Sequence, residues 1–148
     1  MAEKKAIIPI SCDHGGFEMK EFMVKYLTGL GYRIEDLGTF SSESVDYPDF
    51  VHPLAKAVND GVYPLGIIIC GSGNGAQMVA NKYPHVRAAL CWTVEIAKLA
   101  RQHNNANILA LPGRFVDLSL AAAMAEMFLS TPFEGGRHSA RVDKIEIH

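Results

Sequence analysis

Short apolar runs alternate with amphipathic segments along the whole chain, and this alternation limits the folds that the sequence can adopt. The runs expected to form strands cover residues 6–12, 32–37, 65–70, 86–91 and 108–111. The segments with helical spacing of apolar residues cover 17–30, 52–58, 76–82, 94–102 and 118–129. The sequence therefore predicts an α/β fold: one doubly wound, Rossmann-like domain over residues 1–148, with a five-stranded parallel sheet, helices on both faces, and an Arg/His-rich C-terminal tail over 133–148.

Two stretches of this pattern need comment. Pro9 lies inside the first expected strand, which favours an irregular or edge-accessible position because proline cannot donate to a strand ladder. Residues 38–48 are polar and are expected to form a loop.

Charge and composition exclude several classes of protein. The formal net charge of −2 creates no global attraction to nucleic acid or to an anionic membrane, so any anion must be recognised at a local site. No run approaches the roughly 18 apolar residues of a membrane-spanning helix, and the N-terminal M-A-E-K-K shows no signal-peptide core. The three cysteines form no C-x-x-C and no paired Cys/His spacing, which argues against disulfides and a structural metal site. We therefore expect a cytoplasmic protein with free thiols and no nucleic-acid or membrane partner.

Polar residues collect where the expected strands end. The first strand runs into C-D-H-G-G (12–16), the third into C-G-S-G-N-G (70–75) and the fifth into P-G-R (112–114). Ligands of doubly wound sheets bind outside the carboxyl ends of the strands. We therefore expect these three loops to open onto one crevice.

The glycine loop after the third strand suits a phosphate or a developing oxyanion, because glycines allow close backbone approach and a helix N-terminus follows. A plain tight turn is the simpler alternative. The spacing Gly71-x-Gly73-x-x-Ala76 also fits a loose dinucleotide fingerprint, but the next strand ends in Cys91 rather than in an acid. Nucleotide binding is therefore the weaker reading of this loop.

Cys70 is the strongest candidate for chemistry, because a thiol is acidified beside a helix N-terminus. Cys12 and Cys91 are interpreted as small core residues. A redox-sensing role for Cys70 stays open beside catalysis.

The other candidates each have a structural alternative. Asp13 could cap a turn and leave His14 exposed, and Asp46-Tyr47-Pro48 could be a simple turn. His103 could cap the end of a helix, whose dipole would favour its protonated form. The remaining histidines have no constellation around them and are taken as structural: His52, His85 and His148.

The tail carries a second basic cluster. Arg137 and Arg141 are four residues apart, so they share a face if the segment is helical, with His138 beside them. Two guanidinium groups on one face can clamp a phosphate or a carboxylate. An exposed charged tail, or one that packs against another subunit, is the alternative.

Seven motifs in this order resemble the type B ribose-5-phosphate isomerases and the related galactose-6-phosphate and allose-6-phosphate isomerases. They are C-D-H-G-G-F, D-Y-P-D-F, I-I-C-G-S-G-N-G, A-N-K-Y-P, R-A-A-L-C, A-R-Q-H-N-N-A-N-I-L and F-E-G-G-R-H-S-A-R-V-D-K-I, and they cover nearly the whole chain. The resemblance implies a cofactor-free aldose–ketose isomerase for a phosphorylated sugar. It also implies a homodimer, sometimes a tetramer, with the active site shared between subunits.

The resemblance assigns roles by position. Cys70 would be the base for the C1/C2 proton transfer; one branch of the family uses a Glu after the glycine loop, where this chain has Ala76. His103 would open the sugar ring with Asp13 as counterpart, and Tyr47 would line the sugar site. The ene-diolate would be stabilised by Gly71, Ser72, Gly73, Asn74 and Gly75. Asn104 and Arg114 would come, like His103, from the neighbouring chain. The phosphate would be held by His14, Arg137, His138 and Arg141.

Two functional alternatives stay open. A hexose-6-phosphate isomerase would carry the same motifs in a larger pocket. A phosphosugar- or nucleotide-binding module without catalysis is the more remote alternative, which the joint presence of Cys70, His103 and Asp13 disfavours.

Overall fold

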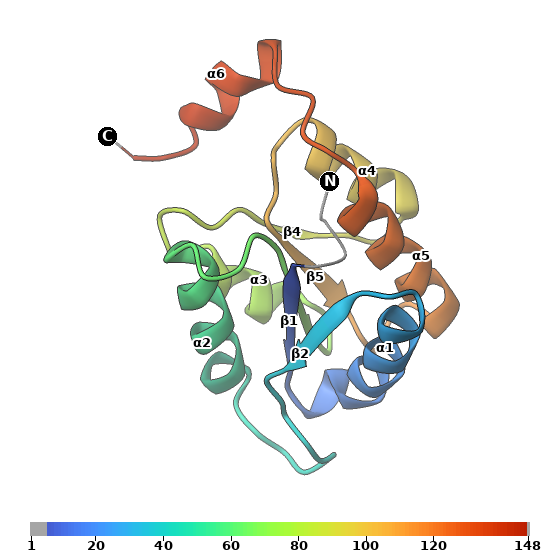
Figure 1. Cartoon of the computed structure of the whole chain (residues 1–148). Coiled ribbons are helices and arrows are strands. Elements are labelled where there is room, and N and C mark those ends of the chain that lie inside the picture. Colours follow the sequence, from blue (N-terminus) through green and yellow to red (C-terminus); the bar gives the residue numbers. More distant parts are fainter. Residues whose placement is uncertain (1–5, 148) are drawn as a thin grey trace.

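A parallel sheet of five strands runs through the centre of the chain (Figure 1). The structure is a computed structural model that describes residues 6–147. The expectation that the N-terminal M-A-E-K-K has no signal-peptide core concerns residues 1–5, which lie outside the described part, as does His148. The strand order is β2-β1-β3-β5-β4, and every neighbouring pair is parallel. The strands are β1 (Ile7–Cys12), β2 (Arg33–Asp36), β3 (Gly66–Cys70), β4 (Ala88–Leu90) and β5 (Ile108–Pro112).

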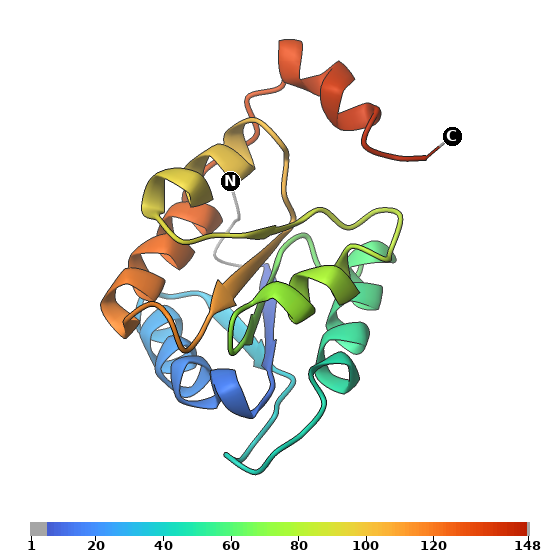
Figure 2. The same cartoon turned by 180° about the vertical axis from the view of Figure 1, so that it is seen from behind.

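Helices cover both faces of the sheet, as a doubly wound fold requires. They are α1 (Phe17–Gly29), α2 (Tyr47–Asn59), α3 (Asn74–Ala80), α4 (Val94–Gln102), α5 (Leu118–Ser130) and α6 (Arg137–Asp143), with a short 3-10 turn, η1 (His14–Gly16), before α1. Helices α1, α4 and α5 lie on one face and α2 and α3 on the other (Figures 1 and 2). The predicted fold class is confirmed.

Side-chain alternation along the central strand decides which way Cys70 points. Ile67 and Ile69 belong to the core beneath α1 and α5, whereas Ile68 and Cys70 belong to the core beneath α2 and α3. Successive side chains of a strand point to opposite faces of the sheet. The Cys70 thiol is therefore on the α2/α3 side, and Cys12, at the end of β1, is on the opposite side.

Helix α2 begins at Tyr47, so the prediction that it would begin at His52 is wrong, and the preceding loop is shorter than expected. Asp46 has the extended backbone of an N-cap residue, and Pro48 lies in the first turn. Proline is tolerated there because the first N–H groups of a helix have no intrahelical partner. Pro53 is accommodated within the helix.

Strand β1 is not an edge strand, because it lies between β2 and β3, but Pro9 itself has a ladder partner only on β2. The ladder to β3 begins only at Ile10, whereas the ladder to β2 includes Pro9. Pro9 therefore precedes the part of β1 that has partners on both sides, so its missing N–H removes no bond to β3.

The C-terminal tail forms a short helix, α6, that stands away from the layered body (Figures 1 and 2). It follows α5 through residues 131–136. Within residues 6–147 no helix combines the length and the apolar character needed to cross a membrane.

Candidate active site

The loops after β1, β3 and β5 meet at the carboxyl edge of the sheet, as the sequence predicts. The N–H of Asp13 donates to the carbonyl of Ile69 at 3.3 Å, and the N–H of Gly113 donates to the carbonyl of Cys70 at 2.9 Å. A Cβ atom on Gly113 would lie 2.8 Å from the carbonyl oxygen of Gly15. The strand end that carries Cys70 is therefore closely flanked by both neighbouring loops.

Asp13 and Cys70 occupy matching places on adjacent strands. The register pairs Cys12 with Ile69, and the next residue along each chain is Asp13 on one and Cys70 on the other. Both residues are buried, and Cys70 is only 4% exposed. The Asp13 carboxylate accepts a hydrogen bond from the N–H of Gly15 at 2.9 Å, so the expected turn-capping contact exists and fixes this side chain.

His14 and Tyr47 flank the same edge from two further segments. His14 Nδ1 accepts a hydrogen bond from the N–H of Val45 at 3.1 Å, which ties η1 to the loop before α2. Its other nitrogen, Nε2, then carries the proton of the neutral ring. Tyr47 packs so closely on Gly75 that a Cβ atom there would lie 2.5 Å from the phenol ring. Only a glycine at position 75 permits this contact.

The glycine loop between β3 and α3 has a backbone that other residues would strain. Gly73, the N-cap residue of α3, has φ of +79°, and a Cβ atom there would lie 2.4 Å from Leu90 Cδ1. Ser72 Oγ accepts a hydrogen bond from the N–H of Asn74 at 3.3 Å, a short turn contact that spans the N-cap residue Gly73.

Arg114 lies on the glycine loop of its own chain. Its N–H donates to the carbonyl of Gly71 at 3.0 Å, and a Cβ atom on Gly71 would lie 3.3 Å from Arg114 Nη1. This differs from the expectation that Arg114 is supplied by a neighbouring chain. Beside it, a cavity of about 440 Å³ is lined by residues of η1, α1 and the β5–α5 connection, among them His14 and Arg114.

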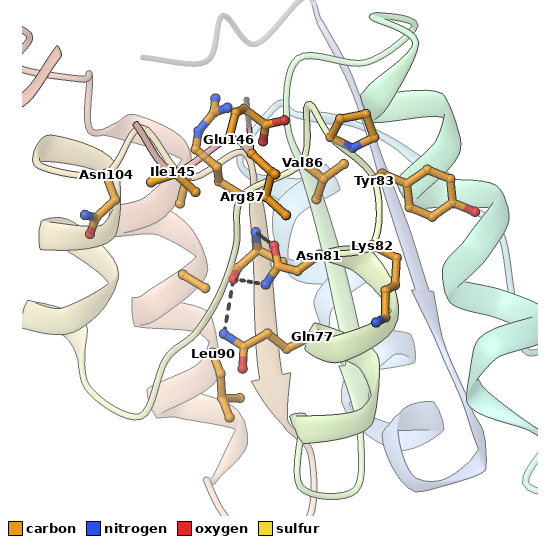
Figure 3. Close-up of a pocket in the computed structure, with 15 residues that line it drawn as sticks. Gln77, Asn81, Lys82, Tyr83, Val86, Arg87, Leu90, Asn104, Ile145 and Glu146 are labelled. Atoms are coloured by element: carbon orange, nitrogen blue, oxygen red, sulfur yellow. Dashed lines mark hydrogen bonds between the residues drawn. The ribbon is translucent and has the colours of Figure 1, made fainter. Parts of the chain in front are cut away.

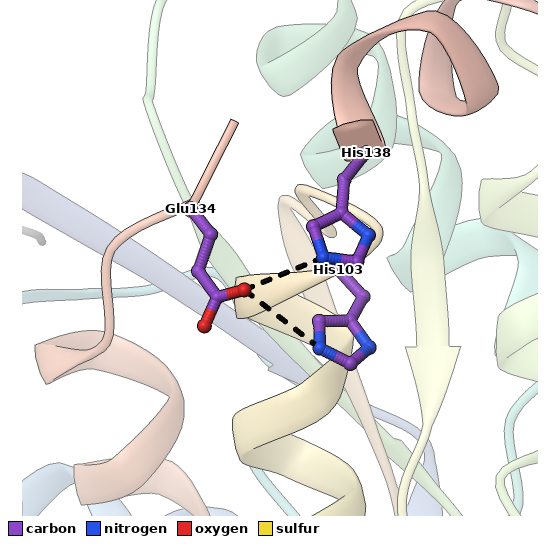
Figure 4. Close-up of side chains that lie close together, drawn as sticks. All are labelled: His103, Glu134 and His138. Atoms are coloured by element: carbon purple, nitrogen blue, oxygen red, sulfur yellow. Dashed lines mark ion pairs between the residues drawn. The ribbon is translucent and has the colours of Figure 1, made fainter. Parts of the chain in front are cut away.

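The remaining candidates lie at the opposite, amino edge of the sheet. His103 is the C-cap residue of α4, and its ring stacks on that of His138 with centroids 4.2 Å apart. Glu134 lies against both rings: its Oε1 is 3.3 Å from His138 Nε2 and 3.9 Å from His103 Nε2 (Figure 4). The structure brings His103 and His138 together, but it does not bring them to Cys70 within one chain.

Arg137 and Arg141 lie on α6, one helical turn apart and both exposed, so the conditional prediction that they share a helix face is confirmed. Asn104 lines a cavity of about 620 Å³ between α3, β4 and the C-terminal segment (Figure 3). In that cavity Asn81 pairs with both backbone groups of Ala88, on the edge strand β4. Cys70 lines neither this cavity nor the smaller one.

The two other thiols are fully buried in the core. Burial raises the pKa of the Cys91 thiol to about 12. Burial also raises the pKa of the Cys12 thiol to about 12, although the nearby Lys20 ammonium opposes the shift. Both remain protonated at neutral pH, which agrees with their interpretation as core residues.

Comparison with known proteins places the chain in a family. A family model described as Ribose/Galactose Isomerase matches residues 8–145. Ribose-5-phosphate isomerase B of Escherichia coli strain K12 is 43% identical over 138 residues, which cover 93% of each chain. This chain belongs to the ribose/galactose isomerase family. The resemblance inferred from the seven motifs is thereby confirmed.

Solved structures of family members have the same fold. A ribose 5-phosphate isomerase from Thermotoga maritima matches with a TM-score of 0.93 and 48% identity, covering 96% of this chain and 98% of that one. Ribose-5-phosphate isomerase B from Mycoplasma genitalium, solved with bound ribulose 5-phosphate, matches with a TM-score of 0.90 and 42% identity, covering 94% and 93%.

Two residues of this family member were not singled out from its sequence. Glu134 lies four residues before His138, a spacing that allows contact, but its proximity to His103 depends on the tertiary fold. Arg101 is buried, and its guanidinium donates to the carbonyls of Thr131 and Ala106. It therefore holds the ends of α4 and α5 together, and no pattern of neighbouring residues in the sequence predicts this role.

Proposed function

We propose that this chain is an aldose–ketose isomerase that interconverts ribose 5-phosphate and ribulose 5-phosphate. The position of Cys70 carries the proposal, because this thiol ends the central strand at the edge where the loops after β1 and β5 meet. Relatives named ribose-5-phosphate isomerase B, one of them with bound ribulose 5-phosphate, support the choice of substrate.

The reaction needs one base that can take and return a carbon-bound proton. The Cys70 thiolate removes the proton from C2 of the open-chain aldose, the C–H electron pair forms the C1–C2 double bond, and the carbonyl electrons move to O1. The thiol then returns its proton to C1, while the O2 hydroxyl proton passes to O1 and leaves a carbonyl at C2. Substrate and product have the same oxidation level, so the step needs no redox cofactor.

The surrounding groups act on the charge that develops. Backbone N–H groups of the loop 71–75 would stabilise the ene-diolate oxygen, a type of contact that typically contributes several kcal/mol to a transition state. Asp13 and His103 would open the furanose ring by acid–base transfer. His14 and the basic groups of α6 would hold the phosphate, whose binding energy positions the reacting carbons.

Steady-state assays of three substrates test the proposal: ribose 5-phosphate, allose 6-phosphate and galactose 6-phosphate. We expect turnover of the pentose and its loss in Cys70→Ala, while Cys91→Ala is the matched control, since that thiol is buried and protonated. Full activity of Cys70→Ala would refute the mechanism, and preference for a hexose would change the substrate alone. The three cysteines are free, which supports the expectation of a reducing, cytoplasmic compartment.

We further propose that two copies of the chain share each active site. In support, Cys70 lies at the carboxyl edge of the sheet, whereas His103 and His138 lie at the amino edge. Helix α6, which carries Arg137 and Arg141, extends away from its own sheet (Figure 2). A second copy related by a two-fold axis would bring Cys70 of each chain next to His103 and His138 of the other, which makes two complete sites per dimer.

Complementation between inactive variants tests this arrangement. Cys70→Ala and His103→Ala are each expected to be inactive alone. After the two are unfolded and refolded together, half of the dimers are mixed, and each mixed dimer has one site without a mutation. Activity should then recover to about a quarter of the wild-type value. No recovery, with mixed dimers shown by mass, would mean that each chain forms its site alone.

A further inference from the structure

Three side chains with metal-binding atoms converge at the amino edge of the sheet, and the proposed isomerisation does not account for one of them. They are His103 at the end of α4, His138 in α6, and Glu134 in the segment between α5 and α6. One candidate ligand atom from each lies within 4.8 Å of the others (Figure 4). The carboxylate of Glu134 faces both imidazoles on their Nε2 side.

The backbone that carries these side chains is held in place. The N–H of Glu134 donates to the carbonyl of Gln102 at 3.1 Å, which fixes the segment before α6 against the end of α4. The buried guanidinium of Arg101 donates to the carbonyl of Thr131 at 3.0 Å and so adds a second tie between the same two segments. The cluster is therefore a product of the tertiary fold and not of a chance meeting of long side chains.

The two imidazoles and the carboxylate each offer an electron-pair donor atom, and the three atoms lie close together. A metal cation can bind all three. Two histidines and one carboxylate form a common catalytic ligand set for Zn²⁺, in which water occupies the fourth position. Imidazole ligands favour Zn²⁺, Co²⁺ and related ions over Mg²⁺ and Ca²⁺.

The distances from the Glu134 oxygen to the two imidazole nitrogens are close to what such an ion needs, and all three atoms lie within 4.8 Å of one another. Ligands about 2.1 Å from a tetrahedral ion lie about 3.4 Å from one another. His138 and Glu134 already have this spacing, at 3.3 Å, whereas the His103 nitrogen has to approach Glu134 by about 0.5 Å. Because the two rings are stacked, the His103 ring must also rotate before both ring planes can contain the ion. The side chains of His103 and Glu134 are 38% and 48% exposed, so they are free to make this adjustment.

We propose that His103, Glu134 and His138 form a binding site for a divalent transition-metal cation of the Zn²⁺ class, with one position open to solvent. A bound ion takes the lone pairs of both imidazoles and places a positive charge between them. It therefore inhibits isomerisation, a consequence that rests on the function proposed above for His103. Glu134 then has the role of anchoring an inhibitory ion rather than of assisting catalysis.

Metal binding is measured without substrate, in untagged full-length protein that carries Cys70→Ala so that this thiol cannot bind the ion. Calorimetric titration with Zn²⁺ should give one ion per chain, and Co²⁺ should give visible absorption typical of a four-coordinate site. In this background Glu134→Gln and His138→Ala should each weaken Zn²⁺ at least about tenfold. His85→Ala, a change at an exposed histidine outside the cluster, and Glu95→Gln, at an exposed carboxylate on α4, should leave the affinity unchanged.

The results separate the metal site from the proposed function. Equal Zn²⁺ affinity of the Glu134→Gln variant and its parent, or equal affinity for Mg²⁺ and Zn²⁺, would overturn the site. With Cys70 intact, Zn²⁺ should inhibit turnover, and the Glu134→Gln variant should need at least about tenfold more Zn²⁺ for the same inhibition. One bound ion per chain without inhibition would keep the site and refute the role proposed for His103.

Discussion

Gly73 and Gly61 offer a matched pair for testing whether the glycine loop is held by packing or only by its backbone angle. Both glycines have φ of +79°. A Cβ atom on Gly61 would meet no atom within 4 Å, whereas one on Gly73 would lie 2.4 Å from Leu90 Cδ1 and 3.2 Å from the carbonyl oxygen of Leu111. Substitution by alanine therefore puts a Cβ atom on a residue with the same positive φ at both positions, and it creates a steric clash at only one.

The expected magnitudes follow from this difference. A left-handed conformation costs a residue with a Cβ atom about 1–2 kcal/mol, so Gly61→Ala should lower the free energy of unfolding by that amount. The clash at position 73 should add about 1–3 kcal/mol, because a packed neighbour must shift. For a chain of this size, each kcal/mol lowers the melting temperature by about 2–4 °C. Gly73→Ala should also reduce isomerase turnover, since the loop backbone moves.

Urea unfolding at a fixed protein concentration, combined with a turnover assay, measures both effects. The stability losses of Gly73→Ala and Leu90→Ala should be less than additive in the double variant, because Leu90→Ala removes the atom nearest to the new methyl group. An equal decrease in the free energy of unfolding for Gly61→Ala and Gly73→Ala would refute the reasoning. It would mean that Leu90 and its neighbours move away from the new methyl group at no energetic cost.

Three further changes test other contacts. Lys20→Met should lower the free energy of unfolding by about 3 kcal/mol, because the buried ammonium donates to both carboxylate oxygens of Asp36. Urea unfolding measures this loss, and Lys20→Arg is the comparison that keeps the charge. The folded-state pKa of Cys91, raised to about 12 by burial, lies above the unfolded value of 9.0, so the unfolded chain loses this proton first. The free energy of unfolding should therefore fall between pH 9 and 12, by up to about 1.4 kcal/mol per pH unit. Urea unfolding at several pH values in this range measures the slope, which should be smaller in Cys91→Ala. Asp117 caps α5, because its carboxylate accepts a hydrogen bond from the N–H of Leu120 at 2.7 Å. Asp117→Ala should therefore lower the free energy of unfolding by about 1 kcal/mol, seen as a lower melting temperature, whereas Asp117→Asn should retain most of the stability.

The elements that follow from local patterning were predictable. The helix over 94–102 and the third strand, which ends at Cys70, are each set by residues close in sequence, and the structure places them where the apolar spacing predicts. The start of α2 was missed because Pro48 was read as a loop residue, although proline fits the first turn of a helix. Strand order was not predictable, since it depends on which edge of the growing sheet each crossover reaches.

The sequence predicts which loops meet at the carboxyl edge of the sheet, but it does not predict the cluster of side chains at the amino edge. The glycine loop and Asp13 follow neighbouring strands, so their meeting follows from the sheet alone. The meeting of His103, Glu134 and His138 depends instead on the direction in which α6 leaves α5, and on the buried contacts of Arg101 that set it. The contact of Arg101 with Thr131 joins segments 30 residues apart, and the spacing of apolar residues along the sequence does not predict it.

The βα topology itself explains why one chain separates the two groups. In a parallel sheet, a residue that ends a strand lies at the carboxyl edge, and the following helix returns the chain to the amino edge. Cys70 is of the first kind, and His103, at the end of α4 just before β5, is of the second. The five residues of β5 span roughly 16 Å at about 3.3 Å per residue, which exceeds the reach of either side chain. If both groups act on one sugar phosphate, a second copy must supply one of them, whatever the details of the helices between.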